Sequence, residues 1–327
     1  MCIIKTDFYQ SIRPFVQDIH TDVLGNIIAH RKGRGKRIML IAHQDVVRMM
    51  VTHIDNNGFL YIKPSGGIDV AIIPARKVLI RHGNQFIIGI VGKKPIHLQR
   101  EESSKLSWDS LWVDIGVSSR KEALQWVELG DYVYFDTPIE NLSGNLISGA
   151  YFDNKVGLSV LALVAERLNT EKVPWEIYFV ASNLEEIGWR GAITASNLIK
   201  PDYCICVDVT HATDYPNSNV IQDGDIRLNA GCALTKGPYI DEGMFARLKQ
   251  IAEHETILHQ IELRPYSTTT EVDLVQIINE GVQCALVSIP CRYMHTPQEV
   301  VSTKDIEAAV DLITYYLLPK VLHINKY

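Results

Sequence analysis

The chain has 327 residues, of which 46% are hydrophobic, and it carries a formal net charge of -6. A mean hydropathy of +0.01 fits a globular protein with a substantial buried core. The acidic balance, with a pI of ≈ 6.0, argues against nucleic acid or an anionic membrane as the main partner, because both reward a concentrated basic surface.

The order of the residues excludes two further classes. No stretch reaches the roughly 18 apolar residues that a membrane-spanning helix needs, and the N-terminus lacks the basic and then apolar layout of a secretory signal. We therefore expect a cytoplasmic protein. The six cysteines form no CxxC pair and no thiolate zinc spacing, so we interpret them as reduced thiols, with Cys204 and Cys206 on one face of a strand.

The first part of the chain predicts the beginning of an α/β core and then an insertion. A basic segment at 30–37 is interpreted as a solvated turn, and the apolar run at 37–42 predicts a buried strand. From 48 to 143 the chain consists of short β-like runs broken by Gly, Asn and Pro, with one helical segment near 119–127. This texture predicts a small β-rich domain of residues 48–143, inserted into a core domain made of residues 1–47 and 144–327.

The α/β pattern resumes near Ser148. Buried strands are predicted at 175–181, 203–209 and 284–289, and helices at about 154–168 and 304–318. The second helix follows Ser302-Thr303-Lys304-Asp305, which is typical of a capping box. Because strands that are apolar on both faces alternate with helices, the predicted fold class is α/β, with a mainly parallel sheet flanked by helices.

Acidic and histidine side chains occur where the predicted strands end, at the edge where open α/β sheets bind ligands. These residues are His43, Asp153, Glu185, Glu186, Asp208 and His295. Each allows an ordinary interpretation by itself, such as a helix N-cap for Asp153, a hydrogen-bonded core histidine for His43, and turn or surface positions for the others. Their arrival at one sheet edge from five separate places in the sequence favours a shared site.

The chemistry of these side chains indicates a pair of divalent cations. Carboxylates and imidazoles without thiolates suit zinc, cobalt or manganese, and one carboxylate can bridge two cations. Such a pair acidifies water and stabilises the oxyanion of an attacked amide, while a further carboxylate takes the proton. The adjacent Glu185 and Glu186 can provide one base and one ligand on a bend that Gly188 and Gly191 allow. Asp45, two residues after His43, is placed to accept the second imidazole N–H.

Five sequence segments match a known pattern in order and approximate spacing. They are Ala42–Asp45, Ala150–Asn154, Glu185–Ala192, Asp208–Ala212 and Arg292–Ser302. They resemble the segments of the M42 family of metallo-aminopeptidases, which includes the glutamyl and tetrahedral aminopeptidases, and the resemblance covers nearly the whole chain.

The resemblance implies an aminopeptidase that hydrolyses N-terminal residues from peptides with two divalent cations, zinc or cobalt in the first place and manganese as an alternative. Glu185 would be the general base. The implied ligands are Asp153 as the bridge, His43 and His295 on one cation, and Glu186 and Asp208 on the other. The inserted domain would be PDZ-like or a β-barrel and would mediate dimerisation, through segments including 89–95 and 113–116. Family members form dimers and often tetrahedral dodecamers.

Three departures from the family pattern leave the preferred N-terminal residue open. Asp45 is followed by Val46-Val47-Arg48, where the family usually has a carboxylate and a glycine. Leu184 stands where a glutamine is expected. The glycine-rich stretch that normally ends in Thr-Asp is replaced here, and both Glu271 and Asp273 are candidates for the position of its aspartate.

Two alternatives remain. The segment from His43 to Val47 also resembles the M20 family of deacylases and carboxypeptidases, whose inserted domain would be a helix-flanked lid with a substrate-binding histidine. The β-rich texture of 48–143 argues against that alternative. A non-enzymatic assembly protein on the same scaffold would have lost the base or a metal ligand, and the sequence has lost neither.

Overall fold

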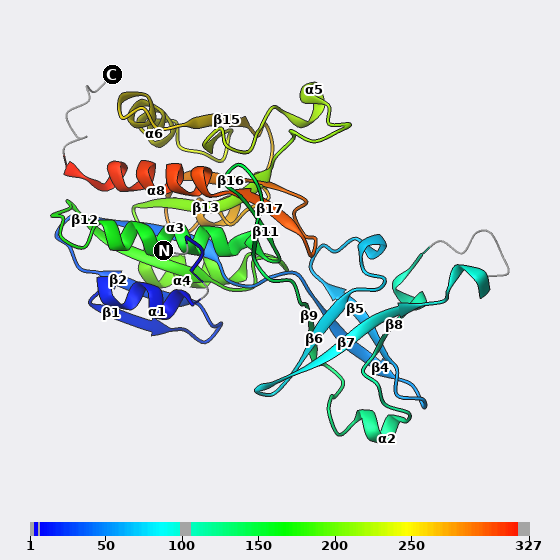
Figure 1. Cartoon of the computed structure of the whole chain (residues 1–327). Helices are drawn as coiled ribbons and strands as arrows, with labels where there is room; N and C mark the ends of the chain where they lie inside the picture. The colour runs from blue at the N-terminus through cyan, green and yellow to red at the C-terminus, as the bar shows by residue number, and fades with distance from the viewer. Residues whose placement is uncertain (1–2, 6, 99–105, 320–327) are drawn as a thin grey trace.

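The computed structural model describes residues 3–5, 7–98 and 106–319, which form a large helix-flanked sheet and a closed β-barrel (Figure 1). Within these residues no helix has both the length and the apolar composition to cross a bilayer. The α/β class with an inserted β-rich barrel is confirmed, and the large sheet is mixed rather than uniformly parallel.

Four parallel strands form the centre of the large sheet, in the order β12-β3-β13-β16. Their bounds are Trp175–Ser182 for β12, Lys36–His43 for β3, Tyr203–His211 for β13 and Gln283–Arg292 for β16. Most of their residues are buried, since helices cover both faces of the sheet. Their shared direction brings the carboxyl ends of all four strands to one edge.

Antiparallel strands extend the sheet on both sides. β1 (Asp18–Thr21) and β2 (Ile27–Arg31) lie beyond β12. Beyond β16 lie β17 (Glu299–Ser302), β11 (Leu146–Gly149) and β10 (Glu140–Asn141), and β16 also pairs with β14 (Cys232–Lys236), which pairs with β15 (His259–Leu263). Because β10 belongs to this sheet, the core resumes a few residues before the expected limit of 143.

Helices cover the two faces of the sheet separately. On the face of Ile38 and Leu40 lie α1 (Phe8–Ile12), α3 (Phe152–Arg167), α6 (Glu242–His254) and α8 (Thr303–Leu317). On the face of Met39 and Ile41 lie α4 (Arg190–Ile199) and α7 (Val272–Val275). A short helix, α5 (Val220–Asp223), follows β13.

The helix that begins at Thr303 does not use the expected capping box. Its N-cap Ser302 accepts a hydrogen bond from the Lys304 N–H. The Asp305 carboxylate instead accepts the N–H groups of Asn229 and Gly231. The Asp305 side chain therefore binds a distant part of the chain instead of capping its own helix.

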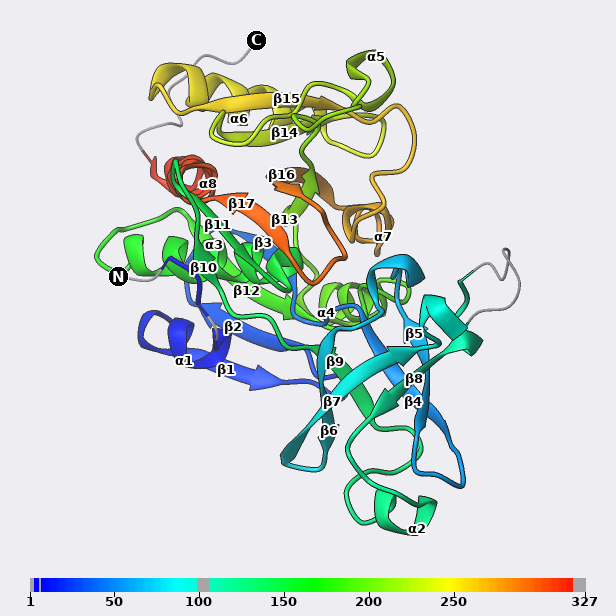
Figure 2. The ribbon, with the colours of Figure 1, turned by 45° about the vertical axis from the view of Figure 1, so that its right-hand side comes forward.

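The barrel has six antiparallel strands and a hydrophobic core of its own. They are β4 (Arg48–Ile54), β5 (Leu60–Ser65), β6 (Lys77–His82), β7 (Gln85–Lys93), β8 (Leu111–Asp114) and β9 (Tyr132–Phe135), with α2 (Arg120–Ala123) between the last two. In Figures 1 and 2 the barrel projects from the large sheet on the side away from α6.

Candidate metal centre

A cavity of ≈ 370 Å³ lies at the carboxyl edge of the central strands. It is lined by all six side chains that the sequence predicts to share a site. His43 is the last residue of β3, Asp208 lies near the end of β13, and Asp153 lies in the first turn of α3. Glu185 and Glu186 follow β12, and His295 follows β16.

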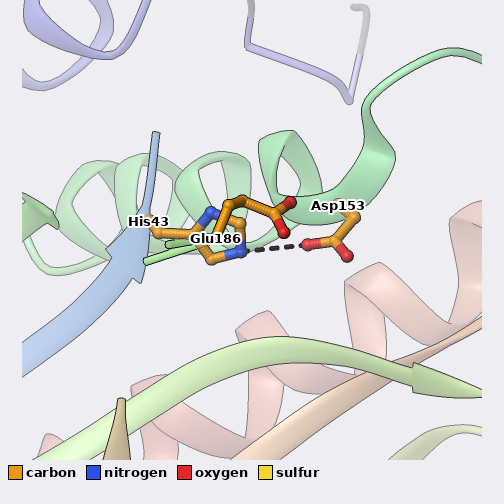
Figure 3. Close-up of side chains that lie close together, drawn as sticks. All are labelled: His43, Asp153 and Glu186. Carbon is orange, nitrogen blue, oxygen red and sulfur yellow. Dashed lines mark hydrogen bonds and ion pairs between the residues drawn. The ribbon is translucent and has the colours of Figure 1, made fainter. Parts of the chain in front are cut away.

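His43 directs one ring nitrogen into the cavity. Its Nδ1 lies 2.9 Å from the backbone carbonyl of Asp45, and its Nε2 lies 2.9 Å from Asp153 Oδ1 (Figure 3). A carbonyl can only accept, so Nδ1 carries a proton and Nε2 faces the carboxylates. Burial lowers the pKa of His43, but Asp153 and Asp208 outweigh it and hold the pKa well above its ordinary value.

Asp153 contacts both imidazoles, each with a different oxygen. Oδ1 faces His43, and Oδ2 lies 3.1 Å from His295 Nε2. Burial raises the pKa of Asp153, and the two imidazoles more than reverse that effect, so the carboxylate is ionised. The N-cap of α3 is Tyr151, which frees the Asp153 side chain from the helix-capping role that it could have had.

Glu186 and Asp208 each lie near one of the two imidazoles. Glu186 Oε2 is 3.4 Å from His295 Nε2, and Asp208 Oδ1 is 3.7 Å from His43 Nε2. These two distances pair His43 with Asp208 and His295 with Glu186, and Glu186 also lies within 4.8 Å of His43 and Asp153. This differs from the grouping that the family resemblance implied, in which His43 and His295 shared one cation.

The cavity holds more carboxylates than its side chains neutralise. Burial raises the pKa of Glu185 to about 9 and of Glu186 to about 7, and it also raises the pKa of Asp208. Glu186 Oε1 is buried without a hydrogen-bond partner in the described part of the chain. Two sets of three residues could each hold a cation, because within each set the ligand atoms lie within 4.8 Å of one another. One set is His43, Asp153 and Glu186, and the other is His43, Glu185 and Asp208. Divalent cations fit this donor set, because they satisfy such oxygens and offset their charge.

Glu185 is oriented by a neighbour that the sequence did not single out. Its Oε1 accepts a hydrogen bond of 2.7 Å from the indole N–H of Trp189, and its Oε2 lies 4.0 Å from His43 Nε2. One carboxylate oxygen is thus fixed while the other faces the cavity.

The sequence predicted that the Asp45 carboxylate accepts the second N–H of the His43 ring, and this was wrong. The His43 ring bonds to the Asp45 backbone carbonyl, and the Asp45 carboxylate is 3.8 Å from Nδ1. That carboxylate accepts the N–H of Glu185 at 3.0 Å and the N–H of Glu186 at 3.2 Å. Asp45 therefore fixes the backbone that carries the two glutamates.

Glu299 was missed by the sequence analysis. Its two oxygens accept the backbone N–H groups of Asp153, at 3.1 Å, and His295, at 2.9 Å. The available signal was a glutamate four residues after His295, at the start of a buried strand. It was weak, because Glu299 acts through main-chain groups.

Glu271 and Asp273 occupy distinct places. Asp273 accepts hydrogen bonds from the N–H groups of Thr268 and Thr269 and from the hydroxyls of Ser267 and Thr268. Glu271 is fully buried, both of its oxygens lack hydrogen-bond partners among the described residues, and burial raises its pKa to about 8. Asp273 thus holds a loop of the cavity wall, whereas Glu271 is buried and does not line the cavity.

Five cysteines are described, namely Cys204, Cys206, Cys232, Cys284 and Cys291, and all are buried and free. Cys2 lies outside the described residues. No described cysteine lines the cavity, so the donor set consists of oxygen and imidazole nitrogen.

Comparisons with known proteins agree with this geometry. A model of the M42 glutamyl aminopeptidase family matches residues 25–312. The lysyl aminopeptidase of Pyrococcus furiosus is 35% identical over 309 residues, which are 92% of this chain and 87% of the relative.

Two solved structures share the fold over almost the whole chain. An aminopeptidase from the archaeon Desulfurococcus kamchatkensis has a TM-score of 0.88 at 29% identity, with coverage of 98% of this chain and 91% of that one. The TET1 peptidase of Pyrococcus horikoshii, described as assembling into a tetrahedron or a large octahedral shell, has a TM-score of 0.84 at 25% identity, with coverage of 95% and 92%. The family match spans every residue of the cavity described above, and the chain therefore belongs to the M42 glutamyl aminopeptidase family and is a peptidase.

Proposed function

We propose that this peptidase removes N-terminal residues from peptides with two divalent cations bound on either side of Asp153. The observation that carries the proposal is that the two oxygens of Asp153 face two different imidazoles, each with a further carboxylate beside it. One cation would be held by His43, Asp208 and Asp153. The other would be held by His295, Glu186 and Asp153.

Zinc or cobalt would suit these ligands best, and manganese is an alternative, because the donors are imidazole nitrogens and carboxylate oxygens without thiolates. When bound, the cations would acidify water and counter the negative charge that develops on the attacked carbonyl. The buried and unpartnered Oε1 of Glu186 supports the assignment, since an ion would satisfy it.

Glu185 would be the general base. Trp189 holds Oε1, which leaves Oε2 to take a proton from the attacking water and pass it to the leaving amine. Asp45 would act as a positioning residue, since it binds the backbone N–H groups of both Glu185 and Glu186. These two hydrogen bonds fix the proposed base, Glu185, and the proposed ligand, Glu186, relative to each other.

Exopeptidase action at a free amino terminus is favoured over the M20-like alternative. The inserted domain is a closed barrel rather than a helix-flanked lid, and the P. furiosus relative is named an aminopeptidase. A non-enzymatic role is disfavoured because the base and every ligand candidate are present in one cavity.

Self-association would use the barrel. Phe86, Ile88 and Ile90 alternate along β7 with their side chains outward, and each is about half exposed or more in the single chain. Outward apolar side chains in a row are typical of interfaces between proteins. With the assembly described for the P. horikoshii relative, this favours a homo-oligomer built from dimers, for which light scattering would give the mass. The cytoplasmic location stays a prediction from the sequence.

The test combines metal analysis with matched substrates. The full-length protein, loaded with zinc, cobalt or manganese, is assayed on peptides with free amino termini and on the same peptides N-acetylated. We expect two cations per chain, loss of activity on chelation, and release of N-terminal residues from the free peptides only. Cleavage of only the acylated set, or full activity without metal, would overturn the proposal.

A further inference from the structure

The ring of His295 is held by a residue of the inserted barrel. Its Nδ1 lies 2.9 Å from the backbone carbonyl of Gly67, in the loop between β5 and the 3-10 helix at Val70–Ile72. Because a carbonyl oxygen only accepts, Nδ1 carries the proton and Nε2 is left to bind a cation. On that side, Nε2 lies 3.1 Å from Asp153 Oδ2 and 3.4 Å from Glu186 Oε2.

The other imidazole is held from within the core domain. His43 Nδ1 lies 2.9 Å from the backbone carbonyl of Asp45, two residues further along the chain. Both rings are thus oriented by a backbone carbonyl, but the two carbonyls come from different domains. Among the described residues that line the active-site cavity, Gly67 is the only one that belongs to the barrel. The barrel therefore reaches the metal centre at Gly67.

The lack of a side chain at Gly67 allows this contact. A Cβ atom at this position would lie 3.2 Å from Nδ1 of His295 and 3.6 Å from its Cε1. A separation of 3.2 Å is tighter than nine in ten Cβ contacts, so an alanine would displace the ring by a few tenths of an ångström. The preceding Gly66 has a φ of 98°, a left-handed conformation that glycine adopts without strain. The sequence of this loop therefore suits a close approach to the ring.

The loop after β5 is anchored on both sides. Ile68 packs against the hydrophobic core of the barrel. Gly66 lies against Val47, a buried residue between β3 and β4, and a Cβ atom at Gly66 would be 2.9 Å from Val47 Cγ1. The hydroxyl of Tyr151, the N-cap of α3, accepts the Phe135 N–H at 2.5 Å and so ties the barrel to the core as well. The position of the barrel on the core therefore fixes the position of the loop and its carbonyl.

The main chain of His295 does not fix its ring. Its φ is 61°, and its backbone N–H donates to Glu299 Oε1 at 2.9 Å. These features hold the backbone, but the side chain is 32% exposed and can still rotate. If the Gly67 carbonyl moved away, water could accept the Nδ1 proton, but a water molecule would not hold the ring in one direction. The carbonyl is therefore the contact that orients this ligand.

We propose that Gly67 is a positioning residue of the metal centre, and that the barrel thereby sets the affinity of the cation held by His295, Glu186 and Asp153. The inference rests on the two-cation function proposed above. The barrel would then contribute to the active site of its own chain, in addition to an interface between chains. Loss of the hydrogen bond that orients a metal-binding imidazole lowers metal affinity by about 10- to 100-fold.

Metal titration of paired variants tests this role. Gly67→Ala places a Cβ atom against the ring of His295, whereas Ile68→Ala loosens the loop without adding an atom. Gly243→Ala on α6 is the matched control, because its Cβ would also lie 3.2 Å from a side-chain atom, Asp241 Oδ1, and it lies outside the cavity. Cobalt binding to the metal-free, full-length proteins is followed by calorimetry and by the visible absorption of Co²⁺, and urea denaturation checks the fold.

We expect two cations per chain in the unmodified protein and in Gly243→Ala. Gly67→Ala should weaken one cation by about tenfold or more and leave the other nearly unchanged, with an altered cobalt spectrum and native urea unfolding. Ile68→Ala should shift the same affinity in the same direction by a smaller factor. In a His295→Ala background, which keeps only the other cation, adding Gly67→Ala should change nothing, since the ring that it displaces is absent.

Two results would overturn the positioning role: unchanged affinity for both cations in Gly67→Ala, or an equal loss of affinity when Gly67→Ala is added to His295→Ala. The second result would show a general disturbance of the site instead of an effect through the ring. Both are read from metal binding and need no peptide cleavage. A chain that binds two cations but cleaves no free peptide would count against the peptidase function alone, whereas one that binds fewer than two would overturn both proposals.

Discussion

The carboxylate of Asp45 accepts a hydrogen bond of 3.0 Å from the backbone N–H of Glu185, and its other oxygen accepts the N–H of Glu186 at 3.2 Å. The preceding Leu184 has a φ of 64°, a left-handed conformation that a non-glycine residue adopts at a cost. Asp45 therefore stabilises a strained turn that places the proposed base and one proposed ligand.

Asp45→Asn should weaken this turn, because an amide can accept only one of the two N–H groups and directs its own N–H₂ at the other. We expect kcat to fall by roughly 10- to 100-fold, with a smaller change in KM. Steady-state kinetics with Asp18→Asn, an exposed aspartate on β1, as the control would test it. Native kcat in Asp45→Asn would contradict the positioning role.

Glu185→Gln keeps the shape of the side chain and its contact with Trp189 but removes the base. We expect kcat to fall by at least about 10²-fold, the scale of a lost general base, while the metal content stays native. Glu253→Gln, an exposed change on α6, is the matched control. A turnover equal to that of the control would refute the role of Glu185.

Asp153→Asn should disturb both cations, because each oxygen of Asp153 faces a different group of ligands. We expect the metal content to fall well below two ions per chain and activity to be lost. His295→Ala should remove one ion and leave the one held by His43 and Asp208. If Asp153→Asn retained two ions and native activity, the bridging role would be wrong.

Much of this arrangement could be predicted because it depends on strand direction. His43 and Asp208 follow apolar runs, and parallel strands deliver their carboxyl ends to one edge, so their convergence could be expected without coordinates. The limits of α3 and α8 differ from the predicted helices by one or two residues, since apolar periodicity marks such helices well.

The parts that could not be predicted depend on turns and main-chain contacts. Asp45 and Glu299 bind backbone N–H groups, and any residue supplies an N–H, so no spacing of residue types reveals such partners. The pairing of His43 with Asp208 depends on where side chains point at strand ends. There the regular alternation of side chains between the two faces of a strand no longer applies. Likewise, the closure of the barrel depends on the pairing of β4 with β9, strands that lie about 80 residues apart.

Asp273→Asn should loosen the loop of Thr268 and Thr269, which lines the active-site cavity. Four donors converge on this carboxylate, and an amide cannot accept from all of them. We expect KM to rise about 3- to 10-fold with a smaller change in kcat, and the unfolding free energy to fall by about 1–2 kcal/mol. Kinetics and urea denaturation would measure both, and unchanged values would show that the loop is held by its other contacts.

Asp305 gives a stability change with pH that is separate from the metal centre. It is fully buried, and burial raises its pKa to about 6, although the N–H groups of Gly231 and Asn229 lower it in part. Because its unfolded pKa is about 3.9, the folded chain binds the proton more tightly, so this contribution is complete below pH 4 and is lost as the pH rises through about 6. Between pH 5 and pH 7 the unfolding free energy should fall by about 1 kcal/mol from this group. Asp305→Asn removes the titration, so urea denaturation of the metal-free proteins should give a flatter pH profile for the variant; parallel profiles would assign the pH dependence to other groups.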